Sequence, residues 1–205
     1  MKKTGSLIVI SGPSGVGKST LIGRVRARMP ELEFSVSCTT RAPRPGEVDG
    51  RDYFFITEEE FSLRESRGEF LETAGVFAHR YGTLRSEVAS RLEAGRDLLL
   101  DIDVQGALSI RRAAAGDPVL AACAAFILIV PPDLQTLEKR LRSRASDSEE
   151  QILKRLAGAG KELSFFRSYD FLIVNDDLDR ASEELYMLLR SLSTRVPLIR
   201  EELFS

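Results

Sequence analysis

An eight-residue glycine-rich loop near the start of the chain constrains its fold more than any other feature. The pattern G-x-x-x-x-G-K-[ST] is matched at every fixed position, by Gly12, Pro13, Ser14, Gly15, Val16, Gly17, Lys18 and Ser19. A continuous apolar run at residues 7–10 precedes the loop, and a helical pattern at residues 19–29 follows it. Strand, loop and helix in this order form a cradle for nucleotide phosphates. The chain is therefore expected to begin an α/β fold and to bind a nucleoside triphosphate.

The residue types in the loop suit that chemistry. Glycines allow backbone angles that point successive N–H groups into one concavity. The following helix aims its positive amino end at the same place. Lys18 supplies a mobile charge for the terminal phosphates, and the Ser19 hydroxyl is placed to ligate Mg²⁺. The motif alone does not separate GTPases, ATPases and small-molecule kinases.

The rest of the chain supports an α/β fold class, a parallel-sheet core flanked by helices. Apolar runs typical of strands buried on both faces recur at residues 98–100, 126–130 and 171–174. Helical patterns alternate with them at residues 84–94, 134–143, 149–163 and 179–192. A length of 205 residues fits one domain with insertions, here residues 1–205.

Two segments interrupt the alternation. Residues 34–83 are rich in Thr, Arg, Pro, Gly and aromatic side chains, with one helix start at residues 57–60, and are expected to form an inserted mixed module for a second substrate. Residues 140–163 form a charged double-helix segment, interpreted as a helical lid. The core is then residues 1–33, 84–139 and 164–205.

Composition limits the partners. The chain has 29 Lys and Arg against 31 Asp and Glu, a formal net charge of −2, which disfavours general nucleic-acid binding. Its longest apolar stretch, residues 119–130, is too short to cross a bilayer. Two cysteines make neither a disulfide framework nor a metal site. A cytoplasmic protein with no membrane or nucleic-acid partner is expected, and oligomeric state has no signal in the sequence.

A loop stiffened by prolines carries three arginines. Arg41, Arg44 and Arg51 lie close together in the sequence, and Tyr53 follows them. Arginine grips phosphate through two parallel hydrogen bonds, and a tyrosine hydroxyl can add a neutral donor. A solvated basic loop explains the same residues equally well, so both interpretations stay open here.

Several separate motifs together resemble one family. Residues 35–53 look like the signature S-x-[ST]-T-R-x-P-R-x-G-E-x-x-G-x-x-Y. The match continues through Glu72, the sequence Tyr81-Gly82-Thr83, the sequence Asp101-Ile102-Asp103-x-Gln105-Gly106, and Val174-Asn175-Asp176. Over about residues 6–192 the chain resembles the guanylate kinase family of P-loop nucleoside monophosphate kinases. The resemblance implies phosphoryl transfer from ATP to GMP, giving ADP and GDP, with Mg²⁺.

The resemblance also implies roles for the residues around GMP. Guanine presents two neighbouring donors and one acceptor, which a carboxylate and a hydroxyl can serve. Residues implied to hold the base are Ser37, Glu72 and Thr83, with Asp103 nearby. Residues implied to hold the GMP phosphate are Arg41, Arg44, Tyr53 and Tyr81. Residues 34–83 become the GMP-binding insertion.

Metal and lid residues complete the expected site. Asp101 ends an apolar run, where P-loop proteins often keep a carboxylate for the metal, although a solvated Asp101 and Asp103 pair is the alternative. By resemblance, Arg144 and Arg155 belong to a lid that closes over ATP and, with Lys18 and Arg41, neutralise the moving phosphoryl group. The sequence Ser143-Arg144-Ala145 departs from the family's G-R-G, which puts the Arg144 role in doubt.

Two further residues, Arg140 and Asn175, each have a structural and a functional interpretation. Arg140 is expected to be a surface salt-bridge partner of a neighbouring glutamate. Asn175 lies near the ATP adenine by resemblance, and a simple turn role is the alternative.

Two rival functions remain. One is another small-molecule kinase, such as a ribose 1,5-bisphosphate phosphokinase, which would not need the set Ser37, Glu72 and Thr83. The other is a non-catalytic guanylate-kinase-like binding module. Such modules typically lose phosphate-loop residues, whereas Lys18 and Ser19 are both present here.

Overall fold

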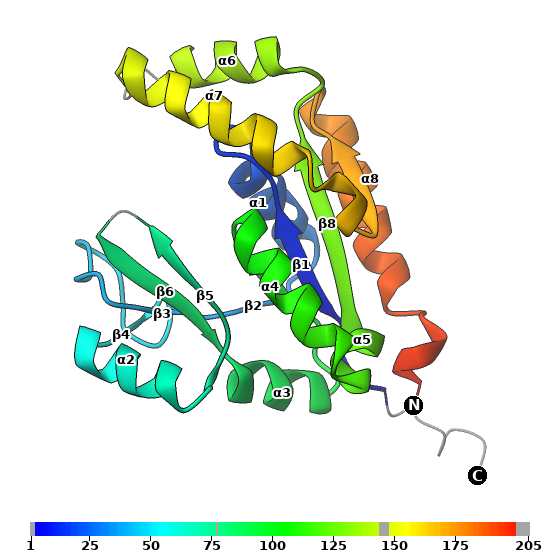
Figure 1. The fold of residues 1–205 in the computed structure, drawn as a ribbon. Coiled ribbons are helices and arrows are strands. Elements are labelled where there is room, and N and C mark those ends of the chain that lie inside the picture. Colours follow the sequence, from blue (N-terminus) through cyan, green and yellow to red (C-terminus); the bar gives the residue numbers. More distant parts are fainter. Residues whose placement is uncertain (1–2, 77, 144–147, 200–205) are drawn as a thin grey trace.

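Five parallel strands form the central sheet in the computed structural model of the protein, which describes residues 3–76, 78–143 and 148–199 (Figure 1). The spatial order of the strands is β2-β7-β1-β8-β9. Their bounds are β1 Leu7–Ser11, β2 Glu33–Phe34, β7 Leu98–Asp101, β8 Ala124–Val130 and β9 Phe171–Val174. The parallel sheet confirms the predicted fold class.

Helices cover both faces of this sheet. Within β1, Ile8 and Ile10 pack on one face against α1 (Lys18–Arg28) and α8 (Leu178–Leu192). Leu7 and Val9 pack on the other face, against helices α3 (Arg85–Glu93), α4 (Val104–Ala115) and α5 (Pro118–Cys123). Successive side chains of a strand point to opposite faces, so a strand buried on both sides must be apolar throughout. That is why β1 has the continuous apolar run seen in the sequence.

The sequence prediction missed α4 and α5, placed only the start of a helix at residues 57–60, and found the remaining α-helices to within one residue at each end. Helix α6 (Leu134–Ser143) and helix α7 (Glu149–Leu163) begin and end where predicted. Helix α4 carries Gly106 in its first turn, a residue that disfavours helix. Helix α5 overlaps the apolar stretch 119–130, so its boundary with the following strand is not visible in the sequence. Asp117 caps the helix, and Pro118 is its first residue.

The inserted segment forms a second sheet of four strands, in the order β4-β3-β6-β5. The strands are β3 Cys38–Thr39, β4 Phe54–Phe55, β5 Phe70–Val76 and β6 His79–Leu84. Helix α2 (Glu58–Ser66) covers this sheet, and its Phe61 ring stacks on Phe70 with 4.5 Å between centroids. Thr57 caps the helix by accepting a hydrogen bond from the Glu60 N–H, as the Thr-x-x-Glu spacing predicts.

Helices α6 and α7 form a hairpin on the opposite side of the phosphate loop from the second sheet (Figure 1). Their contact has its own small core of Leu137, Leu141, Ile152 and Ala159. A capping box between Ser148 and Gln151 starts α7. Arg144 lies outside the described residues. Of the helices within the described ranges, none is both long and apolar enough to cross a membrane.

Candidate active site

The phosphate loop joins the end of β1 to the start of α1. Gly17 has φ +99°, a left-handed conformation, and a Cβ there would lie 2.5 Å from Asn175 Nδ2, so the position requires glycine. Among the described residues no side chain caps α1, whose N-cap is Gly17. The first N–H groups of the helix therefore remain available to an anion.

Lys18 and Asp101 face each other beside this loop. Lys18 Nζ donates to the Gly12 carbonyl oxygen at 2.6 Å. Parallel pairing of β1 with β7 sets Ile10 opposite Asp101 and so brings that carboxylate to the loop. Burial raises the pKa of Asp101, and the Lys18 charge opposes that rise. Ser19 lies in the first turn of α1 with its side chain exposed.

Mg²⁺ bound with a nucleotide commonly takes one or two protein oxygens and completes its shell with phosphates and water. Across residues 3–76, 78–143 and 148–199, no three His, Cys, Asp or Glu side chains form a ready-made metal cluster. The oxygen donors beside the loop are the Asp101 carboxylate and the Ser19 hydroxyl, both hard ligands of the kind Mg²⁺ prefers. These residues fit a metal that arrives with its nucleotide.

A cavity of about 170 Å³ opens between the two sheets. Its lining residues are Ser37, Tyr53, Glu72, Ala74, Tyr81, Asp101 and Ile102. A smaller cavity of about 110 Å³ adjoins it and is lined in part by Ser35. The Ser35 hydroxyl is buried and has no hydrogen-bond partner among the described residues. A buried unpaired hydroxyl beside a cavity is an unused donor and acceptor for a polar ligand.

Glu72 is the buried carboxylate of this cavity. Antiparallel register sets Glu72 on β5 opposite Thr83 on β6, and the Thr83 hydroxyl donates to Glu72 Oε1 at 2.7 Å. The side chain also needs Gly106, because a Cβ there would lie 3.0 Å from Glu72 Oε2. Asp103, the N-cap of α4, is close enough to add charge repulsion. Burial is the main cause that raises the pKa of Glu72, and Thr83 opposes it.

The raised pKa predicts that Glu72→Gln stabilises the ligand-free protein. The folded state holds the Glu72 proton to a higher pH than the unfolded chain does, so stability falls as pH rises from the unfolded pKa through the folded one. The Gln side chain cannot ionise, so the variant does not lose stability in this way as pH rises. We expect its Tm to exceed that of the wild type at about pH 8, with the gap closing towards about pH 4, the ordinary range of a Glu carboxyl. Thermal unfolding at both pH values measures it; a gap independent of pH would contradict the assignment of the effect to this carboxyl.

Arg41 is held by a neighbour in the same loop. Its guanidinium donates twice to Glu47, Nη2 to Oε1 at 2.9 Å and Nη1 to Oε2 at 3.0 Å. The Glu47 carboxylate, with help from Tyr81, raises the pKa of Arg41. Tyr53 and Tyr81 meet edge to face with 5.9 Å between ring centroids. Arg44 is exposed on the same loop, and its backbone N–H donates to Glu47 at 2.7 Å.

A separate cavity, of about 250 Å³, lies on the side of the phosphate loop that faces α6. Its lining residues are Gly15, Val16, Gly17, Thr20, Arg140, Asn175, Asp176 and Leu178. Asn175 Nδ2 donates to the Val16 carbonyl oxygen at 2.7 Å, so this side chain braces the loop. From α7, Arg155 donates to the Ser14 hydroxyl. Helix α7 thus contacts the loop at Ser14, and a recess lies between the loop and Arg140 of α6.

The prediction for Arg140 was wrong. Among the described residues, Arg140 pairs with no carboxylate. Its Nη1 points instead to the Val16 carbonyl oxygen, 3.5 Å away. Helix α6 packs Leu137 and Leu141 against Gly15 of the loop, and Arg140, next to Leu141, lies beside the loop as well. An arginine on a charged helix carries no signal that separates these two outcomes.

Sequence reasoning also missed three residues that shape the site. Glu162 at the end of α7 is half-buried, and burial raises its pKa while Lys18 opposes the rise. The Tyr169 and Ser11 hydroxyls share a hydrogen bond just before the phosphate loop. None of these positions belongs to a local motif, because their partners lie far away in the sequence. Only the fold brings them together.

A parallel-sheet core with this loop, a polar cavity on one side and a lidded recess on the other define a P-loop phosphotransferase that acts on a small second substrate. The sequence model of the guanylate kinase family matches residues 4–192. A guanylate kinase of Cereibacter sphaeroides is 49% identical over 92% of this chain and 87% of its own length. One from Thermotoga maritima is 47% identical over 94% and 89%. A crystal structure of guanylate kinase from Anaplasma phagocytophilum superposes with a TM-score of 0.73 at 32% identity, over 96% of this chain and 90% of the other. The chain belongs to the guanylate kinase family.

Proposed function

We propose that the two cavities beside the phosphate loop divide the substrates, with GMP between the two sheets and ATP on the lid side. The reaction itself, transfer of the terminal phosphoryl group of ATP to GMP to give ADP and GDP, follows from family membership. The protein is an ATP-dependent nucleoside monophosphate kinase.

The buried Glu72 is the observation that carries the GMP assignment. Its carboxylate accepts one bond from Thr83 and keeps free lone pairs towards the cavity that it lines. Guanine offers N1–H and N2–H donors side by side, and one carboxylate can accept both. Ser37 in the same cavity is placed to serve the guanine oxygen, with Asp103 behind Glu72. A ligand with two adjacent donors satisfies this buried charge best.

The GMP phosphate is assigned to the arginine loop and the two tyrosines. Arg41 is already oriented by Glu47, and the hydroxyls of Tyr53 and Tyr81 border the same cavity. Arg44, exposed on the loop, completes the set. Arginine is suited to this task because its fork matches the spacing of phosphate oxygens.

The ATP phosphates are assigned to the loop formed by Gly12, Pro13, Ser14, Gly15, Val16, Gly17, Lys18 and Ser19. Lys18 is next to Gly12 and can turn to the transferring group, and Arg155 already reaches Ser14. Asn175 and Arg140 border the recess where the rest of ATP would lie. Phosphoryl transfer is accelerated mainly by positioning and by charge placed around the moving group.

Mg²⁺ is the expected metal, with Ser19 and Asp101 as its protein ligands. When bound, the metal would neutralise charge on the ATP phosphates. Asp101 stays ionised more readily because of Lys18 beside it, which keeps its oxygens available to a cation. Arg144 is proposed to join the lid arginines, as the family resemblance implies.

We expect the lid and the inserted module to approach each other when both substrates bind. Excluding water protects the phosphoryl group from hydrolysis. Spin labels on cysteines placed at Glu59 in α2 and Leu153 in α7, both exposed, would report the separation by pulsed electron paramagnetic resonance. The distance should shorten with GMP and a non-hydrolysable ATP analogue together. An unchanged distance distribution would remove closure from the mechanism.

An ADP-release assay with ATP and Mg²⁺ tests the proposed function. GMP, AMP, CMP, UMP and ribose 1,5-bisphosphate are offered in turn, each with and without a chelator. Turnover with GMP alone, lost on chelation, is expected. Turnover with ribose 1,5-bisphosphate instead would identify a different small-molecule kinase, and no turnover with any substrate would leave a binding module.

A further inference from the structure

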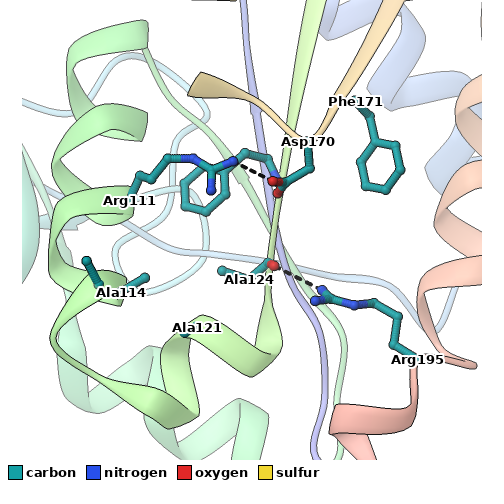
Figure 2. Close-up of a pocket in the computed structure, with 9 residues that line it drawn as sticks. Arg111, Ala114, Ala121, Ala124, Asp170, Phe171 and Arg195 are labelled. Carbon is teal, nitrogen blue, oxygen red and sulfur yellow. Dashed lines mark hydrogen bonds and ion pairs between the residues drawn. The ribbon is translucent and has the colours of Figure 1, made fainter. Parts of the chain in front are cut away.

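Another cavity lies far from the phosphate loop, where β8 and β9 begin (Figure 2). It has a volume of about 380 Å³, and its lining residues are Arg111, Ala114, Ala115, Ala121, Ala124, Phe126, Asp170, Phe171 and Arg195. These residues come from α4, α5, the first residues of β8 and β9, and the turn after α8. Open α/β sheets bind their substrates at the carboxyl ends of the strands, so this cavity at the amino ends is separate from the nucleotide sites.

The cavity exists because β9 is shorter than β8. Pairing of the two strands starts at Ile127 opposite Phe171. Before that point one more backbone bond joins the two segments, from the Asp170 N–H to the Phe126 carbonyl oxygen at 2.9 Å. Side chains supply the other bonds: Asp170 Oδ2 accepts from the Phe126 N–H at 2.9 Å, and Arg195 Nη1 donates to the Ala124 carbonyl oxygen at 2.9 Å. On the edge of β8 that faces away from β1, these bonds replace pairing with β9, and a recess is left along that edge.

The walls of the recess are mostly short apolar side chains, and its two rings, Phe126 and Phe171, lie on opposite faces of the sheet. Alanines of α4, α5 and β8 leave the volume unfilled, as Figure 2 shows for Ala114, Ala121 and Ala124. The Arg111 guanidinium stacks over the Phe126 ring at 4.4 Å from its centroid. Phe171 remains 37% exposed at the rim. Flat apolar walls of this kind suit a planar or short-chain hydrocarbon group.

The charges around the recess do not balance. Arg111 is paired with Asp170 and also donates to the Ser168 carbonyl oxygen. Arg195 is half-buried, and within the described ranges its partner is the Ala124 carbonyl rather than a carboxylate. A guanidinium has five N–H donors, so most of those on Arg195 are not used by that bond. Among the residues that the structure describes, one positive charge therefore faces the recess without a counter-charge.

We propose that this recess binds a small organic anion, a carboxylate or phosphate monoester with a flat apolar body. The anionic head pairs with Arg195, and the body lies on the alanines of α4, α5 and β8. The volume falls within the range of pockets that enclose small molecules. Arg111 links α4 to Ser168, which follows the end of α7 in the chain. The bound anion would therefore lie near the point where α7 joins the core.

Chemical-shift mapping on the full chain, with GMP and ADP present to fill the nucleotide sites, tests the proposal. The probes are 3-phenylpropionate and phenyl phosphate, which share the body and differ in the head, with benzyl alcohol and inorganic phosphate as body and head alone. Saturable shifts at the amides of Ala121, Ala124 and Phe126 are expected for at least one aromatic anion. Dissociation constants should be on the order of 1 mM, as for fragments of this size. The relative affinities of the two anions identify the preferred head.

Three variants separate binding from structure. Arg195→Gln removes the charge, and Ala121→Leu fills the recess without changing charge; each should weaken binding at least tenfold while kinase activity stays unchanged. Arg190→Gln, an exposed arginine of α8 outside the recess, should bind as the wild type does. The proposal is overturned if neither anion shifts these amides, if benzyl alcohol or inorganic phosphate binds as tightly as the aromatic anions, or if Arg195→Gln lowers Tm but leaves binding intact.

Discussion

Replacing Lys18 with alanine is expected to lower kcat for GMP phosphorylation about 10²- to 10³-fold, equivalent to about 3–4 kcal/mol of transition-state stabilisation. In the ligand-free protein Lys18 Nζ is held by the Gly12 carbonyl, at the mouth of the phosphate loop. We expect this flexible side chain to turn towards the terminal phosphate when ATP binds. Negative charge shifts during transfer, so the interaction is stronger in the transition state than in the bound substrate.

Steady-state kinetics with varied ATP separates that loss from a loss of binding. A change confined to KM for ATP would show that Lys18 only binds the ground state. Lys139→Ala, which removes an exposed lysine from α6, is the matched control and should keep wild-type kcat. Removing Lys18 also relieves no strain in the loop, since Gly17 and Asn175 set its conformation, so Tm should change little. Full kcat in the Lys18 variant would mean that this loop does not carry the transfer.

The phosphate loop could be predicted from the sequence because all its parts are local. Backbone N–H groups, the lysine and the serine follow one another along eight residues, and the strand before and helix after have clear periods. The same is true of Thr57 and the start of α2. Local chemistry is visible wherever residue spacing alone places the interacting groups.

Contacts across the fold could not be predicted in this way. The hydrogen bond from Thr83 to Glu72 depends on the register of β5 against β6, which a bulge between Phe70 and Glu72 shifts. Nothing in the composition of residues 34–83 fixes that register. Likewise the recess beside Arg195 depends on where β9 begins relative to β8, a matter of tertiary packing. Site residues whose contacts depend on the tertiary fold could be predicted only through the resemblance to the family.

Arg41 illustrates an intermediate case. The arginines of its loop were ambiguous between a solvated surface and a phosphate site. The structure leaves the Arg41 side chain only 11% exposed and fixes it with both oxygens of Glu47, six residues later. A buried guanidinium fixed by one carboxylate keeps further donors for a second anion. Such preorganisation favours the phosphate interpretation, although spacing could not reveal it.

Glu72→Gln is expected to reduce the preference for GMP over AMP about 10- to 100-fold in kcat/KM, or about 1–3 kcal/mol. The substitution keeps the size and the bond with Thr83 but puts an NH₂ donor where one carboxylate oxygen faces the cavity. Guanine donors would then meet a donor, and a buried polar group would be left without a partner. AMP, which lacks those donors, should lose far less.

The pH dependence distinguishes this role from a structural one. Because burial raises the pKa of Glu72, its carboxylate becomes more ionised as pH rises above the ordinary carboxyl range, and GMP binding by the wild type should improve over that interval. The Gln variant lacks this improvement beyond what GMP itself contributes by titration of its phosphate. Glu59→Gln, an exposed carboxylate in the same module, should retain both the preference and the pH profile. If Glu72→Gln also retained both, the guanine would have to be recognised elsewhere, and the buried carboxylate would serve only to position Thr83 within the small sheet.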